Sequence, residues 1–205
     1  ASALVAAPYG TQFPAQLADG RVLFLPIRSL AGTDKGIASL ILNQSSFEVE
    51  AELADILANL LRPSTPEVVV GLPTLGLSLA RQVAERLGHT RFIALGTSRK
   101  FWYDEALSVP LRSITSPDAT KRLYVDPRML PLLTGRRVCL IDDVISSGSS
   151  ILAALELLNK VAVRPVSIGA AMLQTQRWVA RLQPEFPNIS DSVHGSLVTP
   201  LLTAS

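Results

Sequence analysis

The chain has 205 residues, the length of one domain with a small appendage, and its net charge of +2 gives no field that favours nucleic acid or an anionic membrane. Hydrophobic residues make up 48% and charged residues 18%, which excludes intrinsic disorder. A single cysteine excludes a disulfide framework, and no uncharged apolar run reaches the length of a membrane-spanning helix. The composition predicts a globular, cytoplasmic protein.

The N-terminal third begins with one predicted strand and one predicted helix. Residues 21–27 (RVLFLPI) read as a strand, in which Pro26 disfavours a central place in a sheet. Ser45 and Glu48 have the spacing of a capping box, and apolar residues then recur at helical spacing over 49–61.

From residue 67 onward, predicted strands and helices alternate. The apolar patterns place strands at 68–70, 92–95, 138–141 and 166–172, and helices at 79–87 and 151–158. This alternation predicts an α/β fold in which a parallel β-sheet is flanked by helices. Because ligands of such sheets bind beyond the carboxyl ends of the strands, the strand ends are the places to look for chemistry.

The segment over residues 100–122 breaks this pattern. It holds Trp102, Pro110 and Pro117 among scattered serines and threonines, and shows little periodicity. Long connections without regular structure are uncommon inside a compact domain and are usually functional, so this segment is a candidate lid.

The most informative stretch follows the strand at 138–141. Two adjacent acids, Asp142 and Asp143, lead into a serine-rich loop that opens a helix. Hydroxyls and free backbone N–H groups at a helix N-terminus hold a phosphate monoester, and a glycine there permits close backbone approach. The candidate phosphate residues are Ser146, Ser147, Gly148, Ser149 and Ser150.

The two acids suit a different part of the same ligand. Carboxylates would repel the phosphate, but a few residues upstream they suit neutral donors such as the 2′ and 3′ hydroxyls of a ribose, so the stretch describes a ribose 5-phosphate. The phosphate loops G-x-x-x-x-G-K-[ST] and G-x-G-x-x-G are both absent. The alternative is a strand, a turn and a serine-capped helix with two acids by chance.

Residues 140–150 (LIDDVISSGSS) resemble the phosphoribosyl diphosphate (PRPP) signature of the type I phosphoribosyltransferases. The resemblance covers residues 65–172 and implies the fold of that family. The expected parts are a hood and first helix at 1–64, a PRPP-binding core at 65–172 with the lid at 100–122, and a C-terminal tail at 173–205 that joins the hood.

The resemblance also implies a pyrophosphate site at a neighbouring strand end. Thr74, Leu75 and Gly76 follow the strand at 68–70 and offer backbone N–H groups, although a plain strand-to-helix turn would look the same. Arg99 and Lys100 match basic residues that face pyrophosphate in the family, the alternative being a solvated basic pair. Mg²⁺ is expected as a cofactor carried by PRPP, with no direct side-chain ligand.

The reaction of the family explains why a lid would be needed. Displacement at C1 of the ribose passes through an oxocarbenium-like state that water would capture, and a closing lid excludes that water. The resemblance implies catalytic roles for Asp142, Asp143 and Lys100. It leaves open which basic residue of the lid helps to neutralise pyrophosphate, the candidates being Arg112, Lys121 and Arg122.

The expected activity is transfer of the ribose 5-phosphate of PRPP to a nitrogenous base, with a purine favoured by resemblance alone. The lid ends in TKRLYVDP, without the acidic cluster of adenine phosphoribosyltransferases, which argues against adenine and against a carboxylate general acid. The alternatives are a regulatory protein that binds PRPP without transferase activity, and transfer to another kind of acceptor. The resemblance favours a homodimer, with no nucleic acid or membrane as partner.

Five further residues have ordinary structural interpretations. His89 suits a surface or capping role after a helix, and His194 suits an exposed tail. Trp178 stacks on a base or packs a helix, and Arg28 reaches the base from the hood or remains in solvent. Cys139 lies within a predicted buried strand and is expected to be inert.

Overall fold

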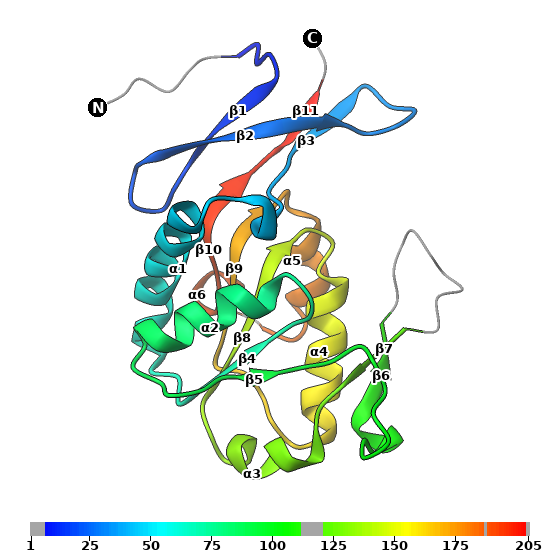
Figure 1. The fold of residues 1–205 in the computed structure, drawn as a ribbon. Coiled ribbons are helices and arrows are strands. Elements are labelled where there is room, and N and C mark those ends of the chain that lie inside the picture. The colour runs from blue at the N-terminus through cyan, green and yellow to red at the C-terminus, as the bar shows by residue number, and fades with distance from the viewer. Residues whose placement is uncertain (1–6, 112–120, 187, 204–205) are drawn as a thin grey trace.

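The computed structural model describes residues 7–111, 121–186 and 188–203, which form a five-stranded parallel sheet with helices on both faces (Figure 1). The strand order is β10-β9-β8-β4-β5, and every neighbouring pair is parallel. The core strands are β4 (Val68–Gly71), β5 (Ile93–Ala94), β8 (Val138–Ile145), β9 (Ser167–Gln174) and β10 (Val193–Thr199). The helices are α1 (Phe47–Leu61), α2 (Gly76–Arg86), α3 (Leu130–Leu133), α4 (Ser149–Lys160), α5 (Arg177–Leu182) and α6 (Ile189–Ser192).

The core strands are apolar on both faces because helices cover both. Val69, Cys139 and Ile141 pack toward α1 and α2, whereas Val70 and Leu140 pack toward α4. Each of these five side chains is fully buried, and burial of a large aliphatic side chain contributes about 1.5–3 kcal/mol. The predicted continuous apolar strands are thereby confirmed, as is the α/β fold.

A second, antiparallel sheet of four strands, the hood sheet, lies above the core in Figure 1. Its order is β1-β2-β3-β11, with β1 (Gln12–Gln16), β2 (Val22–Ser29), β3 (Lys35–Ala38) and β11 (Leu201–Thr203). Only Pro200 separates β10 of the core from β11 of the hood sheet. The hood sheet, which contains strands from both ends of the described chain, therefore begins where β10 of the core stops.

Two local expectations were wrong. Pro26 lies in β2, which is a central strand of the hood sheet. The proline is tolerated because β2 pairs with β1 up to Pro26 and with β3 from Ile27 onward, so Pro26 marks the change of partner. The cap of α1 is Ser46, whose hydroxyl accepts the N–H of Val49 at 3.2 Å, whereas Ser45 instead donates to the carbonyl of Leu42.

The C-terminal tail contributes to the core sheet, which the sequence did not indicate. β9 extends to Gln174, two residues beyond the expected boundary at 172, and β10 adds a further core strand that no pattern in the sequence marked. Only β11 of the tail joins the hood sheet. Helix α1, assigned with the hood, packs on the core, where a β-carbon on Gly169 would stand 2.9 Å from Leu61 Cδ1.

The candidate lid has a structured base. β6 (Ser108–Pro110) and β7 (Arg122–Tyr124) pair as an antiparallel ribbon, and a 3₁₀ turn at Glu105–Leu107 precedes it. Residues 112–120, with Arg112 and Pro117, lie outside the described residues. In the described part of the chain, none of the helices combines the length and the apolar character that crossing a bilayer demands.

Candidate functional site

β8 carries the two acids to the carboxyl edge of the core sheet. Asp142 is buried, with 7% of its surface exposed, and Asp143 is half-buried. Burial raises the pKa of the Asp142 carboxyl well above its ordinary value, and the negative charge of Asp143 raises it further. The backbone N–H of Asp143 donates to Asp142 Oδ1 at 2.9 Å and acts in the opposite direction on this pKa. A hydrogen-bond donor or a positive charge beside Asp142 would therefore stabilise the ionised form of its carboxyl group.

The N-terminus of α2 touches Asp142 directly. A β-carbon on Gly76 would stand 2.9 Å from Asp142 Cα and 3.1 Å from Asp142 Oδ1, so only a glycine permits this approach. No side chain caps α2 at Leu75, which leaves its first N–H groups for another acceptor. The structure therefore brings Gly76 to Asp142, while Leu75 is the N-cap residue of α2 and Thr74 is exposed just before it.

A second helix N-terminus, that of α4, follows the acids. Gly148, with φ of +77°, is the cap residue of α4 and offers no side chain to the helix. Ser147 Oγ accepts the backbone N–H of Ser149 at 3.3 Å and lies 2.9 Å from Ser149 Oγ. Ser146 precedes this loop and Ser150 is exposed in the first turn of α4. The predicted phosphate residues form one compact loop, and its hydroxyls and helix dipole favour an anion.

Two arginines reach this loop that the sequence analysis did not single out. Arg177 Nη2 donates to Ser146 Oγ at 3.0 Å, and Arg181 donates to Ser149 Oγ. Both belong to α5, the short helix that follows β9. Arg177 and Arg181 are four residues apart, so the sequence could have shown that they share one face of a helix. It does not show that this helix, α5, packs against α4.

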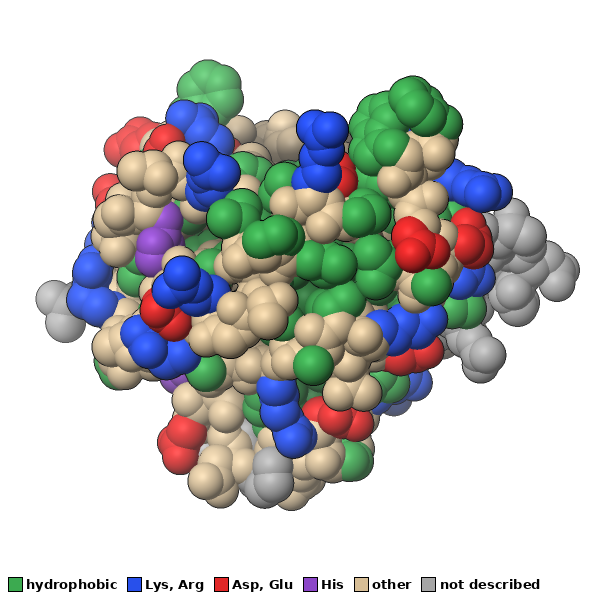
Figure 2. Space-filling view, turned by 90° about the horizontal axis from the view of Figure 1, so that it is seen from below, with side chains coloured by type: hydrophobic (Ala, Val, Ile, Leu, Met, Phe, Trp, Pro, Cys, Tyr) green, Lys and Arg blue, Asp and Glu red, His purple; other side chains and the backbone are tan. Residues whose placement is uncertain are grey.

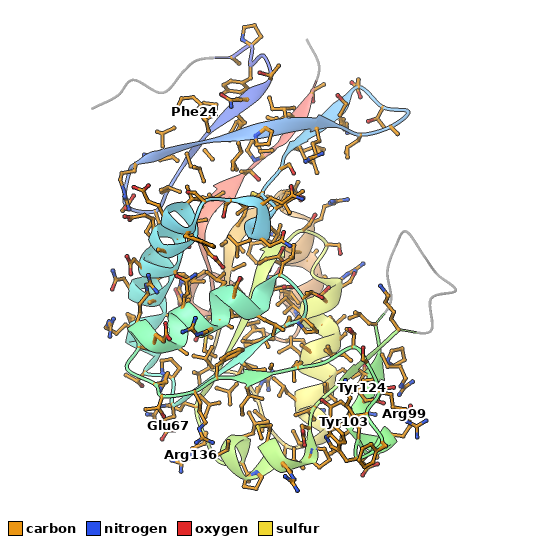
Figure 3. The ribbon with its side chains drawn as sticks, viewed as in Figure 1. Phe24, Glu67, Arg99, Tyr103, Tyr124 and Arg136 are labelled. Atoms are coloured by element: carbon orange, nitrogen blue, oxygen red, sulfur yellow. The ribbon has the colours of Figure 1, made fainter. Side chains whose placement is uncertain are left out.

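The structure places Arg99 and Lys100 elsewhere. Arg99 Nε lies 3.5 Å from Glu105 Oε2, beside the ribbon of β6 and β7, and Lys100 is its exposed neighbour. That ribbon contacts the C-terminal end of α4, where Lys160 Nζ donates to the carbonyl of Ser108 at 2.9 Å. Figure 3 shows Arg99 with Tyr103 and Tyr124 in this lower region. The serine-rich loop at residues 146–150 lies at the opposite end of α4. This helix has 12 residues and is therefore about 18 Å long, at 1.5 Å per residue.

Arg99 thus stabilises the base of the candidate lid in this structure. Glu105 accepts from Arg122 as well, with 3.0 Å between Arg122 Nε and Glu105 Oε1. Arg122 Nε also donates to Ser108 Oγ at 2.9 Å, which joins β7 to β6. These contacts fix the start and the end of the described lid segment, and Lys121 lies exposed at its edge.

The other singled-out residues have structural surroundings. Trp178 is buried and its Nε1–H donates to the carbonyl of Thr175 at 3.0 Å, so it packs α5 instead of facing a ligand. Arg28 Nε donates to Ser39 Oγ at 2.9 Å within the hood sheet. His194 lies half-buried in β10, not in an exposed tail, because the tail forms that strand. His89 is half-buried after α2.

Cys139 lies in the middle of β8 with no exposed surface. Burial raises the pKa of its thiol to about 12, so the thiolate is not formed at neutral pH. The expectation that this cysteine is inert agrees with its surroundings.

On the face of the molecule seen from below (Figure 2), charged side chains of one sign do not gather. Figure 2 shows the face opposite the hood sheet, where basic and acidic side chains are interspersed around a central area of hydrophobic ones. Within residues 7–111, 121–186 and 188–203, no three His, Cys, Asp or Glu side chains come together as a metal site.

Comparison with known proteins identifies the family and the fold of the chain. Residues 42–191 match the family described as phosphoribosyl transferase domain. The bifunctional protein PyrR of Streptomyces coelicolor is 34% identical over 141 residues, which are 65% of this chain and 63% of that protein. The bifunctional protein PyrR of Leifsonia xyli is 34% identical over 131 residues, which are 63% of this chain and 66% of that protein. The chain therefore spans just under two thirds of the length of these relatives.

Solved structures show the same fold. The APRTase of Giardia lamblia, complexed with 9-deazaadenine, gives a TM-score of 0.57 at 20% identity and covers 73% of this chain and 78% of that one. The adenine phosphoribosyltransferase of Saccharomyces cerevisiae gives 0.57 at 19% identity, with 74% and 81% covered. At these identities the likeness is one of fold.

Proposed function

The chain belongs to the phosphoribosyl transferase domain family, that of the type I phosphoribosyltransferases, and we propose that it transfers the ribose 5-phosphate of PRPP to a nitrogenous base. The observation that carries this proposal is the contact of Asp142 with Gly76 at the N-terminus of α2, together with the N-terminus of α4 that follows the same strand a few residues later. PRPP has a matching order of groups: a diphosphate, two ribose hydroxyls and a phosphate monoester.

Each part of the ligand has a proposed partner. Thr74, Leu75 and Gly76 would hold the pyrophosphate through backbone N–H groups, and the acids would accept the ribose 2′ and 3′ hydroxyls. The 5′-phosphate would occupy the serine loop, at Ser146, Ser147, Gly148, Ser149 and Ser150. Arg99 and Lys100 are left out of these contacts, because Arg99 pairs with Glu105 at the far end of α4.

In the proposed reaction, the bond between C1 of the ribose and the pyrophosphate oxygen breaks and its electron pair leaves with pyrophosphate. A ring nitrogen of the base forms the new bond to C1, and the proton of that nitrogen passes to solvent. Asp142 and Asp143 would fix the ribose ring while positive charge develops at C1, so catalysis comes mainly from orientation and electrostatics.

Mg²⁺ would arrive as the complex of PRPP and would neutralise the leaving pyrophosphate. The side chains present fit such a cation without ligating it: the negative charges of Asp142 and Asp143 lie close together, and a cation carried by the bound substrate would relieve their repulsion. The ligands of the cation would come from the substrate and water.

A purine is the base that we propose first, and the hood sheet is the part that would select it. We also propose that the protein is a homodimer, which light scattering coupled to size-exclusion chromatography would test. Because the curated relatives carry the name bifunctional protein, a second candidate function is PRPP binding that regulates a partner.

The deciding experiment measures pyrophosphate release from PRPP and Mg²⁺ with a panel of purine and pyrimidine bases. Release with one base establishes the transferase and identifies its substrate, and the Asp142→Asn/Asp143→Asn protein should release none although it remains folded. Turnover by that variant would contradict the assignment. PRPP binding without release from any base would favour the regulatory function or another acceptor, and absence of PRPP binding would contradict both.

A further inference from the structure

Arg177 and Arg181 both contact the serine loop at residues 146–150. Both are exposed on α5, and each donates to a hydroxyl of the loop, Arg177 to Ser146 and Arg181 to Ser149. The two like charges lie four residues apart on one short helix, a spacing that disfavours the helix slightly unless an anion lies between or near them.

Packing holds these arginines in place. Trp178 and Leu182 of α5 are buried, and their side chains would lie 3.4 Å and 3.5 Å from a β-carbon on Gly148. The buried face of α5 therefore rests on the loop itself, and the adjacent face directs its two guanidinium groups to the hydroxyls. The positions of the arginines relative to the loop do not depend on a mobile chain segment.

The hydrogen-bond chemistry gives the contacts a direction. A guanidinium only donates, so each serine oxygen accepts from its arginine. The hydroxyl hydrogen of Ser146 is then available to another acceptor, and that of Ser149 is available either to Ser147 Oγ, 2.9 Å away, or to a ligand. A hydroxyl that accepts from a cation is also a better donor.

We propose that Arg177 and Arg181 are positioning residues of the 5′-phosphate site: they orient the hydroxyls of Ser146 and Ser149 toward the phosphate and supply the positive charge that balances it. This inference rests on the proposed function, which places the 5′-phosphate in the serine loop.

The test is direct binding of ribose 5-phosphate, and separately of magnesium pyrophosphate, to the wild-type protein and to Arg177→Gln, Arg181→Gln and the double variant. Each single substitution should raise the Kd for ribose 5-phosphate about tenfold, the effect of a lost charge-assisted hydrogen bond, and the double variant should raise it further. The Kd for pyrophosphate, which belongs to the other helix N-terminus, should change less than about twofold. A general loss of structure would weaken both ligands.

Arg164→Gln is the matched control, because it removes the same charge from an exposed arginine whose guanidinium donates to the carbonyl of Glu185, away from the loop. Arg181→Lys should recover part of the affinity by restoring charge without the planar donor. In a Ser146→Ala background, Arg177→Gln should have little further effect, since the hydroxyl through which Arg177 acts is gone.

The outcomes separate the two proposals. If the wild-type protein binds ribose 5-phosphate and the arginine variants bind it equally well, the inference is overturned while the transferase stands. If the variants lose ribose 5-phosphate specifically but no base gives turnover, the inference is supported and the transferase is not. If Arg164→Gln loses as much affinity for ribose 5-phosphate as the α5 variants do, the effect comes from net charge alone and the inference is overturned. A wild-type protein that binds neither ribose 5-phosphate nor PRPP contradicts both proposals.

Discussion

Gly76 and Asp142 are in direct contact across the carboxyl edge of the sheet: a β-carbon on Gly76 would stand 2.9 Å from the Cα of Asp142. Since real β-carbons essentially never approach a backbone atom so closely, this pair fixes how near α2 lies to β8. The distance between the two proposed anion sites depends on that approach.

Gly76→Ala should therefore damage both stability and ligand binding. The new methyl group must displace either α2 or the backbone of β8, at a cost of about 1–3 kcal/mol for overpacking. Chemical denaturation should show this loss, and PRPP affinity should fall with it. Gly10→Ala is the control, because a β-carbon there meets nothing within 4 Å, and its stability should stay within about 0.5 kcal/mol of the wild type. A fully stable Gly76→Ala protein would contradict the contact.

Asp142→Asn should stabilise the folded chain at neutral and alkaline pH. The folded-state pKa of Asp142 is raised, so below the ordinary carboxyl pKa of about 4 both states hold the proton and the two proteins should be equally stable. As pH rises, the unfolded chain ionises first and the wild-type protein loses stability relative to the variant until the folded-state pKa is passed. Thermal unfolding at pH 8 should place the variant at least about 2 °C higher, the shift produced by about 1 kcal/mol. A Tm difference independent of pH would contradict the raised pKa.

Gly148→Ala should cost stability through backbone strain alone. Its φ of +77° is unfavourable for alanine by about 1–2 kcal/mol, whereas the β-carbon would meet Trp178 at an ordinary contact distance of 3.4 Å. Gly135→Ala, at φ of +71° with nothing within 4 Å, should cost about the same. Only the Gly148 variant should also lose affinity for ribose 5-phosphate, which equilibrium binding measures. Equal affinity in both variants would separate Gly148 from the phosphate site.

Cys139 should report on unfolding. Because the only cysteine of the chain has no exposed surface and a thiol pKa of about 12, a thiol reagent at pH 7 should leave the folded protein unmodified for hours. Labelling should accelerate with denaturant in parallel with loss of the far-ultraviolet signal. Rapid stoichiometric labelling without denaturant would show that β8 is accessible in the native state.

The sequence predicted best what is encoded locally. The acids and the serine loop were found because strand, acids, loop and helix follow one another within residues 138–160, so that their order alone describes the site. The contact of Gly76 with Asp142, and the approach of Arg177 and Arg181, arise between elements far apart in the chain, where no local pattern records them. For Arg99 the sequence and the structure point to different places: its position after a strand suggested the edge of the sheet, whereas its side chain lies beside Glu105 at the base of the candidate lid.

The passage of the chain through Pro200 also has a consequence for folding. Leu201 of β11 pairs with Ile37 of β3, so residues from the two ends of the described chain meet in one sheet. Pairing across so long a stretch of chain is slow to form, since the entropy of closing the loop is lost before the contact forms. The parallel core can assemble earlier from nearer neighbours. The last strand of the hood sheet should therefore dock late, after the core has refolded.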